Sequence, residues 1–165
     1  MLLALLLLVP SCGFEPVYGE SRGAAVRTEL QAVRVALIAN RSGQQLRRYI
    51  LDRIHGSDQL PPALYQLEVS VIETRQNYGI QRDLTATYAR LVLTGYYTLR
   101  DLKTQQPVLS GSINAYSSYN VASDPFNTVI AETDARERAV HTLGDDLIIR
   151  VVFYLRNPAA AATSS

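Results

Sequence analysis

The side chains that could perform catalysis or bind a metal are few and scattered in this sequence. Its two histidines, His55 and His141, have no second ligand or acid–base group at a suitable spacing. Asp145 and Asp146 are adjacent on a predicted helix and point about 100° apart, which favours a solvated face over a metal site. The sequence contains no glycine-rich phosphate loop, nucleophile elbow or HExxH motif. We therefore expect a non-enzymatic protein with no catalytic residue, metal site or cofactor.

The single cysteine has a distinct context, because it follows a segment typical of exported proteins. Residues 1–9 form an unbroken apolar run, much shorter than the roughly 20 residues that span a bilayer. This run followed by Ser11 and Cys12 resembles the lipobox of bacterial lipoproteins. The resemblance implies that residues 1–11 are a signal peptide and that Cys12 becomes the lipid-bearing N-terminus. The alternative is that Cys12 is an ordinary free thiol.

The composition is that of one domain with almost no net charge. The chain has 165 residues, 47% of them hydrophobic, and a formal net charge of +1. This length suffices for one domain with a core, and the charge argues against nucleic-acid binding. Residues 22–103 nevertheless hold twelve basic and seven acidic residues, a net of +5, whereas residues 124–156 hold four and six, a net of −2. The basic part could bind phosphate or sugar through arginine, or it could simply aid solubility.

Periodicity predicts the elements that carry these residues. Alternating apolar residues predict strands over 30–38, 65–74, 85–101 and 108–121, and helical spacing predicts helices over 44–55 and 125–156. Ser42 and Asp124 are the candidate helix N-caps, and Asp124 is followed by a proline. The order β-α-β-β-β-α predicts an α+β two-layer sandwich, with two helices on one face of a four-stranded, mostly antiparallel mixed sheet. Residues 12–29 are interpreted as the lipidated N-terminus and tether, 30–156 as the single domain and 157–165 as a disordered tail.

One face of the predicted sheet is polar and aromatic. The residues that alternate with the apolar ones include Tyr88, Arg90, Tyr96 and Tyr116, among serine, threonine and asparagine. An antiparallel sheet can expose one face to water. Tyrosine and arginine are, however, enriched at protein interfaces. The pattern leaves both solvent and a partner open as neighbours of this face.

The order of several short segments resembles the LptE family of LPS-assembly lipoproteins. The similarity begins at Cys12 and covers nearly the whole chain that follows. The segments that carry it are CGFEPVYG (12–19), SGQQLRR (42–48), YQLEVS (65–70), GIQRD (79–83), ATYARL (86–91), YTLRD (97–101), SYNV (118–121) and DPF (124–126).

The resemblance implies a function without covalent chemistry. Members of this family are outer-membrane lipoproteins that plug the lumen of the LPS-assembly β-barrel LptD, assist its folding and bind lipopolysaccharide on its way to the outer leaflet. A hydrophilic, tyrosine-rich sheet face suits the polar lumen of such a barrel, which makes Tyr88, Tyr96 and Tyr116 the expected barrel contacts.

The resemblance also implies where lipopolysaccharide binds. Arg82 corresponds to a basic residue in the turn between two strands that is implicated in this contact, and Arg75 and Arg90 are weaker candidates from the strands. A second family contact, a lysine early in the last helix, has no counterpart in residues 128–133. The alternative for Arg82 is an exposed turn residue paired with Asp83. The alternative function is a periplasm-facing lipoprotein scaffold of another envelope complex that does not bind lipopolysaccharide.

Overall fold

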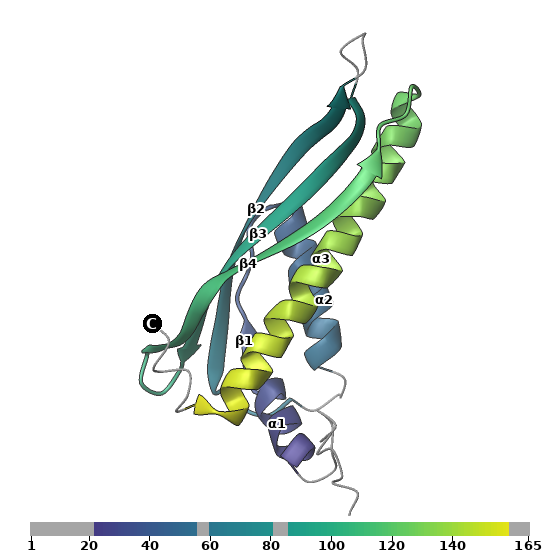
Figure 1. Ribbon diagram of the computed structural model, residues 1–165. Helices are drawn as coiled ribbons and strands as arrows, with labels where there is room; N and C mark the ends of the chain where they lie inside the picture. Colours follow the sequence, from purple (N-terminus) through teal and green to yellow (C-terminus); the bar gives the residue numbers. More distant parts are fainter. Residues whose placement is uncertain (1–21, 56–59, 81–85, 159–165) are drawn as a thin grey trace, which may run out of the picture.

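The computed structural model describes residues 22–55, 60–80 and 86–158 (Figure 1). Along the chain the elements are α1 (Arg22–Gln31), β1 (Val33–Val35), α2 (Asn40–Ile54), β2 (Tyr65–Ile80), β3 (Ala86–Asp101), β4 (Pro107–Asn120) and α3 (Pro125–Arg156). Three long strands and α3 run side by side along the molecule, and α2 and α3 cover the same face of the sheet (Figure 1).

The sheet has the order β1-β2-β3-β4. The short β1 pairs with β2 in parallel, whereas β2 with β3 and β3 with β4 pair antiparallel, with a register shift at Leu99/Arg100. The predicted class is therefore confirmed as an α+β fold with a four-stranded mixed sheet and helices packed on it. The 32 residues of α3 span about 48 Å at 1.5 Å per residue, close to the length of the long strands.

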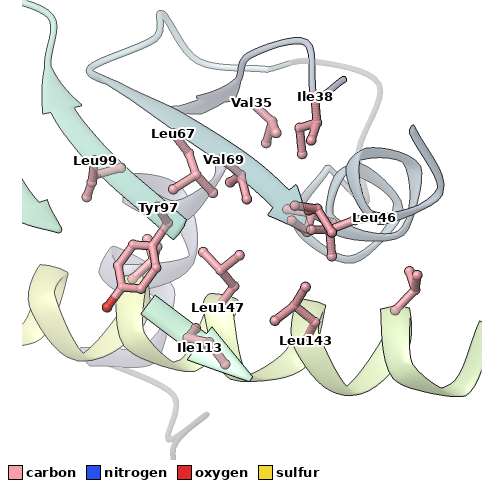
Figure 2. Packing of buried hydrophobic residues seen from close by; sticks show 14 of the residues in the cluster. Val35, Ile38, Leu46, Leu67, Val69, Tyr97, Leu99, Ile113, Leu143 and Leu147 are labelled. Atoms are coloured by element: carbon pink, nitrogen blue, oxygen red, sulfur yellow. The ribbon is translucent and has the colours of Figure 1, made fainter. Parts of the chain in front are cut away.

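The core lies between the sheet and the two long helices. Leu46 of α2 and Leu143 and Leu147 of α3 are fully buried against side chains of all four strands (Figure 2). Gly95 of β3 permits the close approach of α3, since a Cβ at this position would lie 3.3 Å from two carbons of Leu143. A smaller cluster of Ala89, Tyr119 and Ala135 continues the core toward the end of the sheet where β2 passes to β3, called the distal end below.

The start of α3 agrees with the prediction, whereas that of α2 differs. Asp124 caps α3 by accepting a hydrogen bond from the Phe126 N–H at 3.0 Å. Helix α2 begins at Asn40, whose side-chain oxygen accepts from the Gly43 N–H at 2.8 Å. Ser42 is therefore not the N-cap: it lies inside the helix, is 2% exposed and donates a hydrogen bond to Glu73. A long-range partner thus replaces the local capping role expected for this serine.

Several boundaries also differ from the prediction. Residues 22–31, expected within the tether and at the start of a strand, form α1, which contacts α3. Strand β1 is correspondingly short, and Leu37, an apolar residue of the expected strand, lies beyond it and is 80% exposed. Strand β2 continues to Ile80, through part of the expected turn. Val129, which fits the helical apolar spacing, is 62% exposed because it lies on the outer side of α3. The predicted signal peptide and most of the tether and tail lie outside the described residues.

Candidate functional site

The face of the sheet opposite the helices is the candidate functional surface, called the open face below. Odd-numbered residues of β3 such as Leu91 and Leu93 are buried under the helices, so the even-numbered residues point to the opposite side. Tyr88, Tyr96 and Tyr116 are 40%, 52% and 58% exposed on this side. The structure thus places the three predicted contact tyrosines together on the open face.

An aromatic group with an arginine at its centre occupies the distal part of the open face. Tyr78 of β2 is stacked on Tyr88 of β3, with ring centroids 5.4 Å apart and an interplanar angle of 11°. The Arg90 Cζ lies 5.3 Å from the Tyr78 ring centroid and 6.0 Å from that of Tyr116. We call these four residues the Arg90 cluster. Each cation–π contact at such an exposed position contributes about 0.5–1 kcal/mol.

The Arg90 cluster offers donors to an anionic or sugar-containing ligand. Its guanidinium is planar, always charged and suited to bidentate contact with phosphate oxygens. The Tyr78 hydroxyl donates to the Gln76 Oε1 at 2.7 Å, which holds this ring in place. The rings of Tyr78 and Tyr116 orient the Arg90 side chain, and Arg90 remains exposed to solvent. The arrangement can bind and orient charged groups, and it contains no nucleophile–base pair.

Tyr96 lies on the same face but outside the Arg90 cluster. It pairs with Ser70 of β2 and Ser112 of β4, several residues further along the sheet. Nearby, Thr94 donates its hydroxyl proton to Asn114 Oδ1 at 2.8 Å. The open face is therefore aromatic and basic at the distal end and mixed toward its middle, where the exposed Tyr96 and Ile72 lie among small polar residues.

Tyr78 is the member of the Arg90 cluster that the sequence analysis missed. It falls in the segment expected to be a turn, but β2 continues through it and pairs Tyr78 with Tyr88. The signal for it was available, since Thr74, Gln76 and Tyr78 continue the polar alternation of β2 by two-residue steps.

Arg75 and Arg90 lie on opposite sides of the sheet. Arg75 pairs with the buried Leu91, so its side chain lies on the helix side of the sheet. Its position four residues after the buried Val71 in the same strand indicates the same side. There its Nη1 is 3.2 Å from Glu132 Oε2, and its Cζ lies 5.6 Å from the Tyr119 ring centroid. The structure thus brings Arg90 into contact with one predicted tyrosine, Tyr116, and into the same cluster as a second, Tyr88. It places Arg75 in a separate network with α3.

Arg82 and Cys12, the other predicted site residues, lie outside the described residues. The strand residues that flank the predicted Arg82 turn, Ile80 and Ala86, are paired with each other. The pair Tyr78 and Tyr88 follows directly, so the Arg90 cluster begins next to the segment that contains Arg82.

The network around Arg75 links α2, β2, β4 and α3 on the helix side. Arg136 donates two bonds of 3.1 Å and one of 2.8 Å to the Glu73 carboxylate, and one of 2.8 Å to Glu132 Oε1. Burial alone would raise the pKa of Glu73, but the hydrogen bonds from Arg136 and Ser42 and the Arg136 charge outweigh it and lower this pKa. Burial and a 3.0 Å bond to Glu132 raise the pKa of Tyr119 to about 12. These contacts fix the helices on the sheet.

The two histidines and Asp145 make structural contacts. The ring of Tyr49 in α2 stacks on that of His141 in α3, with the ring centroids 4.4 Å apart. The Tyr49 hydroxyl donates a hydrogen bond to Asp145 Oδ1 at 2.8 Å. The Nε2 of His55 lies 3.3 Å from the Val33 carbonyl oxygen. Within the described ranges, no cluster of three or more histidine, cysteine or acidic side chains could hold a metal ion. Nor does any helix there have the length and apolarity to cross a membrane.

Solved structures with the same fold support this architecture. A Caulobacter crescentus protein, described as a candidate lipoprotein, has a TM-score of 0.66 and 22% identity, covering 81% of this chain and 97% of that chain. A minor lipoprotein from Acinetobacter baumannii has a TM-score of 0.52 and 17% identity, and the match covers 73% of this chain and 88% of that chain. A Xanthomonas campestris protein has a TM-score of 0.54 and 12% identity, and the match covers 80% of this chain and 88% of that chain. At these identities the likeness concerns the fold.

A family model gives the more specific result. The comparison with curated proteins found no match. The model of LptE, described as lipopolysaccharide-assembly, matches residues 30–152. This range contains β1 to β4, α2 and nearly all of α3, together with the Arg90 cluster. Because the match covers most of the chain and the whole sheet, the chain belongs to the LptE family of lipopolysaccharide-assembly proteins.

Proposed function

We propose that this protein is a lipid-anchored outer-membrane component of lipopolysaccharide assembly that plugs the LptD-type barrel, assists its folding and binds lipopolysaccharide during delivery to the outer leaflet. The match of the family model to residues 30–152 carries this proposal. The open face supports it, because one side of a long sheet presents polar and tyrosine side chains, together with the exposed Ile72, instead of a core. The protein acts by binding and needs no covalent chemistry.

The membrane anchor is proposed to be an acylated Cys12. Each buried methylene of an acyl chain contributes about 0.8 kcal/mol, so several chains on one residue hold a protein at a membrane. Two of the proteins with this fold are described as lipoproteins or candidates. Replacement Cys12→Ser is expected to release the protein from the membrane fraction and to lower its mass by that of the lipid. A variant that stays membrane-bound at unchanged mass contradicts the anchor.

The open face is proposed to contact the inner wall of the barrel. The lumen of an outer-membrane barrel is lined by polar side chains and water, so a plug needs a hydrophilic surface. Tyr88, Tyr96 and Tyr116 supply amphipathic rings there, which can cover area and still donate hydrogen bonds. Helices α2 and α3 lie on the other side of the sheet (Figure 1). The three rings are therefore not covered by these helices, and they are 40–58% exposed.

Lipopolysaccharide is proposed to bind at the distal end, with Arg82 and Arg90 contacting its phosphates. Charge-assisted bonds from arginine to phosphate are about twice as strong as neutral hydrogen bonds. Such contacts would compete with the divalent cations that bridge neighbouring lipopolysaccharide molecules. Arg75 is the weakest of the three candidates, because its contacts with Glu132 and Tyr119 keep it on the helix side.

Titration of purified lipopolysaccharide onto the protein tests the binding proposal. We expect Arg82→Glu and Arg90→Glu each to weaken binding about tenfold or more, because each reverses a charge at the proposed phosphate site. Arg150→Glu makes the same charge change at an exposed position of α3 and is the matched control. Equal affinity of all three variants and the unchanged protein would remove both arginines from the site.

Photocrosslinking in cells tests the barrel contact. A photoreactive residue in place of Tyr96 or Tyr116 is expected to capture the LPS-assembly barrel. The same residue in place of Asp134, exposed on α3, is the control for the helix side. Crosslinks to the barrel from position 134 and none from the open face would reverse the proposed orientation. Crosslinks to an unrelated envelope protein alone would instead support the scaffold function.

A further inference from the structure

The middle part of the open face contains no charged side chain, and we call it the neutral strip. It consists of Val92, Thr94 and Tyr96 of β3 and their partners in β2 and β4, which form three rows across the sheet. The partners are threonine, serine, asparagine, isoleucine and tyrosine residues. Hydroxyl and amide groups therefore lie around two exposed rings, those of Tyr96 and Tyr116.

Charged side chains lie at both ends of the neutral strip, but their surroundings differ. At the end away from the Arg90 cluster, Arg100 Nε lies 3.6 Å from Glu68 Oε1, so the two charges offset each other. At the distal end, Arg90 contacts the rings of Tyr78 and Tyr116. Among the described residues, no carboxylate forms an ion pair with Arg90. This part of the chain thus presents an uncompensated positive charge at the distal end and a neutral surface next to it.

The two exposed tyrosines of the neutral strip lie at increasing distances from Arg90. Tyr116 pairs with Val92, which is two residues from Arg90 along β3, and Tyr96 lies four residues further along this strand. At about 3.3 Å per residue, these steps place the two rings about 7 and 20 Å from Arg90 in the strand direction. A ligand that contacts all three side chains is therefore an extended chain with an anionic group at one end.

The chemistry of the neutral strip matches that of a sugar chain. A sugar ring has an apolar face of C–H groups, which packs on aromatic and aliphatic side chains, and hydroxyls that donate and accept hydrogen bonds. Tyr96 and Ile72, each 52% exposed, present apolar surface, and the Tyr96 partners Ser70 and Ser112 have hydroxyls on either side. An acyl chain would leave these hydroxyls unpaired, and a charged peptide would find no opposite charge here.

We propose that the neutral strip binds the sugar chain of lipopolysaccharide, with the anionic inner end at Arg90 and the neutral outer sugars over Tyr116 and Tyr96. The inference rests on the proposed function and adds a direction to it: the glycan runs from the distal end along β3 toward the middle of the sheet. The phosphates of lipopolysaccharide lie on its lipid and inner sugars, so its charge falls along its length as that of the open face does. In the barrel the same face borders the inner wall, and the glycan passes between the two during delivery.

Titration of the full-length protein with two forms of lipopolysaccharide tests the inference. One form has a complete core oligosaccharide, and the other lacks only the neutral outer sugars, so both have the same lipid and phosphates. We expect Tyr96→Ala to weaken binding of the complete form about fivefold, because a ring that packs on the outer sugars is lost. Binding of the shortened form should not change. Arg90→Glu should weaken binding of both forms equally, since it acts at the end that they share.

Two control variants separate ring contact from other effects. Tyr96→Phe keeps the ring and removes the hydroxyl, so it should retain most of the affinity for the complete form. Phe153→Ala removes a ring that is 63% exposed on α3, outside the open face, and should change binding of neither form. Because Tyr96 is exposed, its replacement should leave the fold intact, which equal melting temperatures verify. A Tyr96→Ala effect that is equal for the two forms, or absent from both, overturns the inference.

The possible outcomes separate this inference from the proposed function. If lipopolysaccharide binds and the effect of Tyr96→Ala does not depend on the outer sugars, the inference is wrong, the proposed function stands and the open face serves the barrel alone. If the unchanged protein binds neither form, the proposed binding is wrong, and the dephosphorylated core oligosaccharide alone decides the inference. An NMR titration that shifts the signals of Tyr96 and Tyr116 then supports a sugar-binding face, and unchanged signals refute it.

Discussion

Replacing Arg136 with methionine should destabilise the fold by about 2 kcal/mol at pH 7. The side chain of Arg136 is only 13% exposed and connects Glu73 with Glu132. Breaking a fully buried ion pair costs about 3–5 kcal/mol, because one charge is left without its partner. Here both carboxylates keep roughly a quarter of their surface in solvent and keep a second partner, Ser42 or Arg75. The expected loss therefore lies between that value and the about 1 kcal/mol of an exposed pair.

The loss should depend on pH in a defined direction. The folded protein lowers the pKa of Glu73 below its ordinary value of 4.5: burial opposes this change, but the bonds from Arg136 and Ser42 and the Arg136 charge outweigh burial. A group with a lowered folded pKa stabilises the fold above its unfolded pKa and loses that contribution as the pH falls through the folded value. The methionine variant lacks the main cause of the lowering. The difference between the two proteins should therefore be largest near pH 7 and should narrow below pH 4.5.

Urea denaturation at pH 7 and at pH 3.5 measures this difference. Urea is preferred to guanidinium chloride because the latter is a salt and screens the ion pair. We expect a lower midpoint with an unchanged denaturant slope at pH 7 and a smaller difference at pH 3.5. Arg150→Met is the control, since position 150 is exposed on α3 and should change stability by less than about 0.5 kcal/mol. An Arg136→Met loss that is equal at both pH values, or no larger than the control at pH 7, would refute the reasoning.

Three further changes test the packing. Leu143→Ala should cost about 3 kcal/mol in urea denaturation, whereas Leu37→Ala should cost less than about 0.5, because Leu143 is fully buried and Leu37 is 80% exposed; equal losses contradict the core assignment. Gly144→Ala should lower the melting temperature, because its Cβ would lie 2.5 Å from the Tyr49 ring; an increase would show that the ring moves freely. Asp124→Ala should cost about 1 kcal/mol by removing the α3 cap, and Asp124→Asn, which can also cap, should retain most of it.

The elements with strong periodicity were predictable from the sequence. The apolar alternation of β3 over sixteen residues has one buried face, which fixes the side on which Tyr88 and Tyr96 lie. The start of α3 was also predictable, since Asp124 and Pro125 combine two local signals for the first turn. In both cases the determining interactions lie within a few residues of the chain.

The features that depend on distant partners were not predictable in this way. Helix α1 has no clear amphipathic pattern, and it contacts α3, which lies far along the chain. Ser42 resembles a helix cap, but Glu73, 31 residues away, determines its role. The distal part of β2 contains an expected turn, yet the pairing of Tyr78 with Tyr88 extends the strand.

The candidate site was predictable to the same extent. The alternation in β3 and β4 placed Tyr88, Arg90 and Tyr116 on one face, and the structure brings Arg90 and Tyr116 into contact. The separation of Arg75 from this face follows from its position relative to Val71, but its partner Glu132 lies 57 residues away. Spacing within a strand indicates the face of a side chain, whereas its contacts depend on the tertiary packing.

Affinity purification of the tagged full-length protein from its native outer membrane tests the central claim most directly. We predict that an LPS-assembly β-barrel of the LptD type accompanies the protein in approximately equal amounts. Recovery of the protein from that membrane without the barrel, or with another envelope complex in its place, would contradict this account.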